Sequence, residues 1–253
     1  DAQHSATTLG GWGRPGTPCP DEPCPARDTG RVVYIGAADF MPYWYGDPPL
    51  DLVEHEMGHA LGWPHSSTSP DSFGQGVYDS VIDVMSNSAA PRDTVPESRN
   101  APGALALNLY LSGWIDDSGV RVIDSVSLTA EPVAIEIAAS PWSPESGSRL
   151  VVVNVSATSF VTIEMITSGV DNVHIGGSGV AVHLIDFSDD VCDVPPCTGT
   201  ARRQTLASAS GTGDGLLRVG FGSVEVGDIR VSVDKVFVGS SGDSAVVLVS
   251  AVA

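Results

Sequence analysis

Positive charge is the scarcest feature of this 253-residue sequence. Lys235 is the single lysine, and twelve basic residues in total stand against 31 acidic ones, which gives a formal net charge of −19. A chain this acidic is unsuited to nucleic acid or anionic lipid, because both carry phosphates. Long apolar runs are also missing: Leu150 to Val153 is among the longest, far short of the roughly 20 residues that span a bilayer. With 42% hydrophobic and 17% charged residues, the composition predicts a folded globular protein.

Cysteine is also scarce, and its placement is informative. Four cysteines form two pairs of identical spacing, Cys19 with Cys24 and Cys192 with Cys197, in proline-rich loops. Because proline can preset a turn, each pair suits a short local disulfide, although a four-thiolate zinc site is an alternative. The first residues lack the basic start and apolar stretch of a signal peptide, which leaves a mature secreted chain or a cytosolic one. The disulfide interpretation favours a secreted protein.

Three zones differ in composition along the chain. Residues 1–30 are rich in glycine and proline and are expected to be loop, whereas 31–114 contain helical patterns. From about Ile115 onward, short runs rich in Val, Ile and Thr alternate with turn residues and show no helical period. These runs predict strands at 120–128, 132–138, 149–155, 159–166, 179–187, 216–221, 229–238 and 245–251. We therefore expect an α+β protein with two domains, the first over residues 1–114 and an antiparallel β-sandwich over 115–253.

Two helices are predicted in the first domain. The first begins near Asp47, where an aspartate caps the helix and Pro48 fits its first turn, and it ends at Gly62. Apolar residues at helical spacing predict its buried face: Leu50, Val53, Met57, Ala60 and Leu61. The second helix is expected over 100–112, with Gly113 as its C-terminal stop. Its predicted apolar side consists of Leu105, Leu109 and Tyr110.

The residues suited to chemistry lie on the first predicted helix and just after it. His55 and His59 are four residues apart, so both imidazoles project from one helical face, and Glu56 lies about 100° around the helix. Gly62 allows a sharp backbone turn that returns His65 toward them as a third ligand. Three neutral imidazoles are typical of a zinc ion whose fourth position is open. The alternative is an amphipathic helix with unrelated histidines.

The run from His55 to His65 has the pattern HExxHxxGxxH and resembles the signature of the metzincin zinc metallopeptidases. Met85, twenty residues after His65, resembles the methionine of the tight turn beneath the zinc in that family; filling a gap in the core is its alternative role. Asn87 stands where astacin- and serralysin-like members have a tyrosine, so no tyrosine ligand is expected there.

Weaker similarities narrow this resemblance. Ala101–Ala104, leading to Leu111–Ile115, is similar to the helix that ends in an LGW motif in gametolysin-like and immune-inhibitor-A-like secreted peptidases. Three later stretches resemble the β-rich segment that follows the catalytic domain in those proteins: Val161–Glu164, Gly169–Asp171 and Gly177–Asp186. Only 54 residues precede His55, which is short for the sheet that metzincins place before this helix. We therefore expect Asp1 not to be the natural beginning of the folded unit.

The resemblance implies a secreted zinc endopeptidase that acts on a protein or peptide substrate. The three histidines would hold zinc, a zinc-activated water would attack the peptide bond, and Glu56 would be the general base. The strand Arg31–Gly36 would lie at the edge of the cleft and pair with an extended substrate. Tyr78 and Tyr45 are candidate donors to the oxyanion.

Other conspicuous residues have simpler interpretations. His183 alternates with apolar residues and is expected inside the β-sandwich, and His174 and His4 are expected to be solvated. Calcium is a second candidate cofactor at acidic loops, namely Asp189, Asp190 and Asp214. Two rival functions remain at this point: a β-sandwich adhesion or glycan-binding protein with a vestigial metal site, and zinc hydrolysis of a bond other than a peptide. The retained Glu56 argues against the first rival, and the cleft-edge strand argues against the second.

Overall fold

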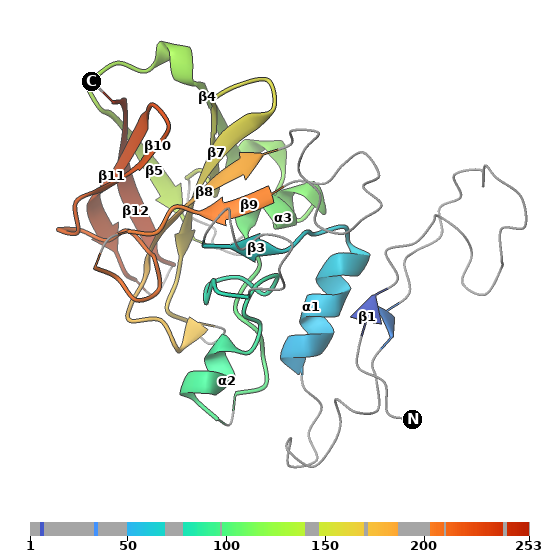
Figure 1. Ribbon diagram of the computed structural model, residues 1–253. Coiled ribbons are helices and arrows are strands. Elements are labelled where there is room, and N and C mark those ends of the chain that lie inside the picture. Colours follow the sequence, from blue (N-terminus) through green and yellow to red (C-terminus); the bar gives the residue numbers. More distant parts are fainter. Residues whose placement is uncertain are drawn as a thin grey trace, which may run out of the picture.

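The fold is mixed α/β and consists mostly of β-sheet (Figure 1). The structure, a computed structural model, describes residues 6–7, 33–34, 50–68, 78–96, 98–139, 147–169, 172–186, 203–209, 211–239 and 242–252. Within these ranges no helix has the length and apolar character needed to cross a membrane. All four cysteines lie outside the described residues, so the two disulfides stay predictions.

The first of two large sheets is antiparallel throughout. Its four strands lie in the order β10-β11-β12-β5. They are β5 (Val133–Ala138), β10 (Ser223–Val226), β11 (Ile229–Phe237) and β12 (Ser244–Ala251). The predicted strand at 216–221 is wrong: only one isolated bridge, Val180 to Leu217, forms there, and β10 begins later. Gly227 turns the chain between β10 and β11 with a φ of +57°, a backbone region that favours glycine.

The second sheet has six strands in the order β3-β9-β8-β7-β6-β4. They are β3 (Ser66–Ser67), β4 (Val120–Asp124), β6 (Leu150–Asn154), β7 (Ser159–Ile166), β8 (Gly179–Asp186) and β9 (Arg203–Leu206). The pairs β3–β9 and β4–β6 are parallel, so the expected antiparallel arrangement holds only in part. The chain passes from β4 through β5 in the other sheet before it returns as β6. On its return, β6 therefore runs in the same direction as β4.

The main hydrophobic core lies between the two sheets. Side chains alternate along each strand, so every second residue of β5 and β10–β12 and of the central strands β6, β7 and β8 faces this core. The six-stranded sheet contributes Val151, Val153, Val161, Ile163, Met165, Val180 and Val182, and the four-stranded sheet contributes Ile135, Ile137, Val224, Val226, Ile229, Val231, Val233, Ala245, Val247 and Val249. Face-to-face packing of this kind fits the strand alternation seen in the sequence.

The opposite face of the six-stranded sheet packs against residues that come before β4. Ile82 joins a cluster with Ile166 and Leu206, and Leu107 joins another with Ile185. In addition, β3 follows His65 directly and extends the sheet beside β9, with α1 (Leu50–Ala60) beyond it (Figure 1). Contacts therefore cross residue 115 extensively, and the division into domains at that residue stays a prediction.

The predicted start of the first helix near Asp47 lies outside the described residues, whereas the second helix begins later than expected. The described part of the first helix is α1, and the second is α3 (Ala106–Leu111), a shorter element than the predicted 100–112. A third helix, α2 (Ala90–Thr94), was not predicted. Short 3₁₀ turns occupy Asp117–Gly119 and Ser125–Ser127.

The predicted buried face of α1 is wrong for three of its five residues, and the other two, Val53 and Ala60, are half-buried. Leu50, Met57 and Leu61 are 40%, 53% and 48% exposed, whereas the buried residues of the helix are Asp51, His55, Glu56 and Gly58. Asp51 forms an ion pair with Arg92 of α2, which gives this inward face a charged partner. The helix thus turns its polar face inward, and the apolar spacing did not identify the side that packs.

Little of the first 49 residues is described. β1 (Ala6–Thr7) and β2 (Val33–Tyr34) form an antiparallel pair that contacts α1. β2 lies within the predicted strand Arg31–Gly36, while Tyr45 and His4 lie outside the described residues. The expectation about upstream strands stays a prediction.

His183 is fully buried in β8, as expected for a sheet residue. Val182 and Leu184 face the core between the sheets, so alternation places His183 on the other face with Ala181 and Ile185. Neither ring nitrogen has a hydrogen-bond partner in the described part of the chain. Burial lowers the pKa of His183 from 6.5 to about 3, because the charged ring would lose its hydration.

This histidine should make the fold sensitive to acid. The pKa of His183 is lower in the folded state than in the unfolded state. As the pH falls from 6.5 towards 3, His183 is therefore protonated in the unfolded chain but stays neutral in the folded one. Stability should then fall with a slope of up to about 1.4 kcal/mol per pH unit. In urea unfolding at pH 7 and pH 4.5, His183→Leu should lose less stability between the two pH values than the wild type. Thr162→Val, which alters the residue paired with His183 but no titratable group, is the control. Equal losses in His183→Leu and the wild type would contradict this prediction.

Candidate metal centre

The structure brings His55, His59 and His65 together. The ring centroids of His55 and His59 are 4.8 Å apart, and those of His59 and His65 are 4.5 Å apart. One ligand atom from each of the three residues lies within 4.8 Å of the others. Three histidines in this arrangement could hold a metal ion.

A glycine turn returns His65 to the helix. Gly62 has a φ of +90°, which a residue with a side chain adopts only with strain. Its amide donates to the carbonyl of His59 at 2.9 Å, and the Trp63 amide donates to the carbonyl of Gly58 at 2.9 Å. These two bonds form a Schellman motif, which ends α1 and reverses the chain. The predicted role of Gly62 is confirmed.

The hydrogen bonds of two rings engage Nδ1 and leave Nε2 as the nitrogen that could bind a metal ion. His55 Nδ1 donates to the Val84 carbonyl at 2.7 Å, and His59 Nδ1 donates to the Trp63 carbonyl at 3.0 Å. Because a carbonyl can only accept, both rings carry a proton on Nδ1, so Nε2 is the nitrogen that the neutral form of each ring offers to a metal ion. His59 Nε2 and His65 Nε2 are 2.9 Å apart, close to the roughly 3.3 Å expected between ligands of a tetrahedral ion with bonds of about 2.0–2.1 Å.

Electrostatics also favour the metal-binding form of His55. Burial, and after it the neighbouring His59, lower its pKa from 6.5 to about 4, although the hydrogen bond to Val84 acts in the opposite direction. His55 is therefore neutral near pH 7, the form that coordinates a metal ion.

Glu56 is buried beside this cluster, with 7% of its surface exposed. Its charge acts on His55, whose pKa it raises slightly. A carboxylate on the same helix, next to a ligand, is in the region where a general base would be needed.

Met85 lies against the helix that carries two of the histidines. It is fully buried in a cluster with Trp63, Val84 and Ala101. A Cβ added at Gly58 would overlap the Met85 Sδ and come within 2.8 Å of a Trp63 ring carbon. The turn that presents Met85 is closed by the Asn87 amide, which donates to the Ser80 carbonyl at 3.0 Å. The methionine thus fills the space that the glycine of α1 leaves open.

Gly58→Ala is expected to destabilise the protein despite the better helix propensity of alanine. The substitution gains up to about 1 kcal/mol in the helix, but forcing a methyl group into a filled core typically costs about 1–3 kcal/mol. We expect a net loss of about 1 kcal/mol in urea unfolding, part of which Met85→Ala should restore in the double variant. A Gly58→Ala variant more stable than the wild type would show that this packing is loose.

Tyr78 lies over two of the three imidazoles. Its ring makes edge contacts with His65 and His55 at centroid distances of 5.1 and 5.7 Å, and it is 46% exposed. The next residue, Asp79, accepts hydrogen bonds from the amide and hydroxyl of Thr68 at 2.8 and 2.7 Å. This clamp holds Tyr78 beside the segment that follows His65. In the sequence, Tyr78 was a candidate only because it lies near the histidines along the chain. The structure shows that its ring contacts His55 and His65.

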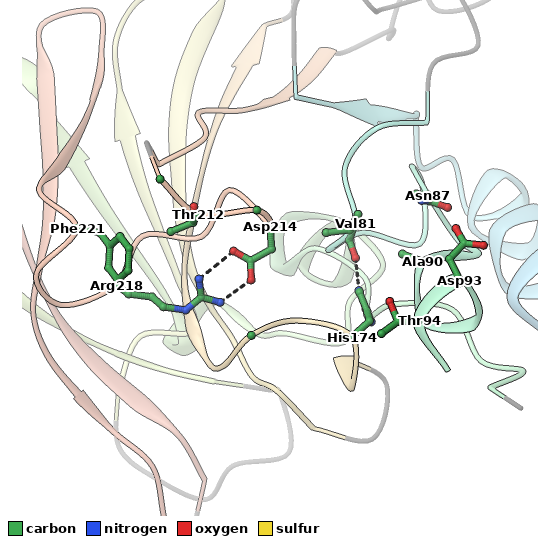
Figure 2. A pocket seen from close by; sticks show the side chains of 13 residues that line it. Val81, Asn87, Ala90, Asp93, Thr94, His174, Thr212, Asp214, Arg218 and Phe221 are labelled. Atoms are coloured by element: carbon green, nitrogen blue, oxygen red, sulfur yellow. Dashed lines mark hydrogen bonds and ion pairs between the residues drawn. The ribbon is translucent and has the colours of Figure 1, made fainter. Parts of the chain in front are cut away.

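Two other residues differ from expectation, and both line a separate cavity of about 490 Å³ (Figure 2). His174 was expected to be solvated, but it is part-buried and its Nε2 donates to the Val81 carbonyl at 2.5 Å. Asp214 was a calcium candidate, but both of its oxygens accept from the Arg218 guanidinium, at 2.9 and 2.5 Å. The ion pair occupies the carboxylate that calcium would need. Asp189 and Asp190 lie outside the described residues.

A buried carboxyl beside the centre was not predicted from the sequence. Asp83 is fully buried and accepts a hydrogen bond from Ser66 Oγ at 2.5 Å, one residue after His65. A signal was available, since Asp83 is the one charged residue in the apolar run from Val81 to Met85. A charge within such a run indicates a buried, hydrogen-bonded carboxyl.

Comparison with known proteins leaves the centre to be interpreted from its own residues. No family model matches the chain, and no curated protein or solved structure matches it. The centre itself offers three imidazoles that could share a metal ion, a buried glutamate next to them and a buried methionine packed against their helix.

Proposed function

We propose that this protein is a secreted zinc-dependent endopeptidase of the metzincin type, with its catalytic part in residues 1–114 and a β-sandwich domain over 115–253. The observation that carries the proposal is the convergence of His55, His59 and His65 with Glu56 buried beside them. Chance histidines on a helix would have no reason to orient their Nδ1 protons away from a common point.

Zinc fits this donor set better than calcium or magnesium. The ligands are nitrogen atoms, whereas calcium and magnesium prefer oxygen. When bound, zinc lowers the pKa of a water molecule towards neutrality and polarises a carbonyl group. Three protein ligands leave a fourth position for that chemistry.

The residues of the chain would divide the remaining work. Glu56 would take a proton from the attacking water and deliver it to the departing amine. Tyr78, which contacts His55 and His65 and is partly exposed, would donate its hydroxyl to the oxyanion. The buried Met85 would hold the floor of the site in place.

The substrate would be an extended peptide. β2 contacts α1, and a strand beside the zinc helix can pair with an extended chain by strand addition. Secretion is proposed from the two cysteine pairs, whose local disulfides would need an oxidising compartment.

Metal analysis combined with a peptidase assay tests the proposal. The purified protein should contain one zinc ion per chain and cleave an unstructured protein such as reduced casein. The rival function, a binding protein with a vestigial metal site, predicts metal without hydrolysis. Absence of both metal and hydrolysis would overturn the proposal altogether.

A further inference from the structure

Two buried carboxyl groups behind the metal centre have no role in the proposed reaction. Asp83 belongs to the turn that presents Met85, and Glu164 belongs to β7 of the six-stranded sheet. Asp83 is fully buried and Glu164 is 3% exposed. Buried carboxyls are costly, so their contacts need an explanation.

Asp83 joins three segments around the centre. It accepts from Ser66 Oγ at 2.5 Å, from the Met85 amide at 3.2 Å and from the Leu105 amide. Ser66 begins β3 directly after His65, and Leu105 precedes α3. The carboxyl therefore fixes the segment after a ligand, the methionine turn and the beginning of α3 relative to one another.

Glu164 holds the next amide of the same helix. Its Oε2 accepts from the Ala106 amide at 2.7 Å, while Oε1 has no hydrogen-bond partner among the described residues. Consecutive amides, Leu105 and Ala106, thus bind one carboxyl from the turn and one from the sheet. The beginning of α3 connects the sheet to the metal centre.

Burial makes it unfavourable for Asp83 and Glu164 to be charged at the same time. Burial raises the pKa of Asp83 to about 6, and burial together with the charge of Asp83 raises the pKa of Glu164 to about 8. Among the described residues, His65 lowers the pKa of Asp83, and His183 on the neighbouring strand β8 is neutral. Glu164 is consequently a neutral acid near pH 7, and its contact with Ala106 is a hydrogen bond without an ionic contribution.

The contacts continue to two of the metal ligands. The Val84 carbonyl, next to Asp83, accepts from His55 Nδ1 at 2.7 Å. The Ser66 amide, next to His65, donates to the Met85 carbonyl at 3.2 Å. A shift of the turn would therefore move the supports of His55 and His65 together.

We propose that Glu164 is a positioning residue for the metal centre: through its hydrogen bond from β7 it holds the beginning of α3, and through Asp83 it holds the turn and the segment that orient His55 and His65. This inference rests on the proposed metal-binding function. It makes the six-stranded sheet a support of the site rather than a neighbouring module.

Cobalt(II) provides the test, because its visible spectrum reports the geometry of its ligands. The full chain, stripped of metal, is titrated with Co²⁺ at pH 7 against a competing chelator, for the wild type, Glu164→Ala and Glu164→Gln. Loss of a group that supports a metal ligand typically lowers metal affinity about 10–100-fold. We expect a loss in this range for Glu164→Ala, together with an altered Co²⁺ spectrum. Glu164→Gln keeps an uncharged acceptor for Ala106, so its affinity should lie within about threefold of the wild type.

Two further variants separate positioning from stability. Met165→Ala removes the neighbouring side chain of β7, which faces the core between the sheets, so it should lower stability but leave Co²⁺ affinity and spectrum unchanged. Ala106→Pro removes the amide hydrogen that Glu164 binds. Proline is tolerated there because Ala106 is the first residue of α3 and because the preceding Leu105 has an extended backbone (ψ 142°). Ala106→Pro should therefore lower Co²⁺ affinity by the same range, about 10–100-fold, expected for Glu164→Ala. It keeps the test available if Glu164→Ala does not fold.

The outcomes are decisive in each case. Wild-type affinity and spectrum in Glu164→Ala or Ala106→Pro would overturn the positioning role, and so would a Glu164→Gln variant as weak as Glu164→Ala. A wild type that binds no Co²⁺ would refute the metal centre itself, and the positioning role with it.

Discussion

Glu56→Ala is expected to keep the fold and the metal ion and to lose peptide hydrolysis by about 10²–10⁴-fold, the range that proton transfer by a positioned side chain contributes. The substitution removes the proposed proton carrier but none of the three imidazoles. Metal content, unfolding temperature and kcat/KM of the same preparation should be measured together. We expect only kcat/KM to change, and the loss to lie in kcat rather than KM.

Glu54 offers a matched control on the same helix. It is exposed, and its Oε2 accepts a hydrogen bond from the Ala101 amide at 2.7 Å. Glu54→Gln retains that acceptor and removes one negative charge from α1, as Glu56→Gln does. Activity should survive in the first variant and collapse in the second. Turnover near the wild-type value in Glu56→Gln would mean that another group is the base.

Removal of the metal ion is expected to lower the unfolding temperature by about 8–16 °C. A ligand present at about a thousandfold excess over its Kd stabilises the folded state by about 4 kcal/mol, and each kcal/mol corresponds to about 2–4 °C in a protein of this size. Scanning calorimetry with and without a chelator measures the shift, and zinc, but not magnesium, should reverse it.

Histidine variants show whether this shift comes from the proposed centre. His65→Ala should abolish the chelator effect, because two imidazoles hold zinc far less tightly than three. His174→Ala, which alters a histidine that binds the Val81 carbonyl instead, should retain it. An unfolding temperature that is unaffected by the chelator would contradict metal binding at this site.

The centre is more predictable from the sequence than the fold around it, because its geometry is local. A spacing of four residues places His55 and His59 on one face of any α-helix. A positive φ at Gly62 needs no distant contact, since the two hydrogen bonds that form the turn lie within the six residues Gly58 to Trp63. Strand alternation is equally local, and β7 and β8 lie at the predicted positions.

Features that depend on distant partners were missed or wrong. β9 reads Arg-Gln-Thr-Leu, which has little strand character, and it exists as a strand because it pairs with β8 and β3. The parallel pairing of β4 with β6 depends on the passage of the chain through the other sheet.

The sequence by itself therefore determined the histidine triad of the candidate metal centre, the turn that completes it and the alternation of the long strands, because each follows from the backbone geometry of a few consecutive residues. The tertiary structure alone decided which face of α1 is buried, how Asp83 and Glu164 meet at the beginning of α3, and that the sheet reaches the metal centre. The physical reason lies in burial and hydrogen bonding between distant segments. Apolar residues such as Met57 and Leu61 stay exposed when a polar face of the same helix finds better-matched partners, and no local pattern contains those partners.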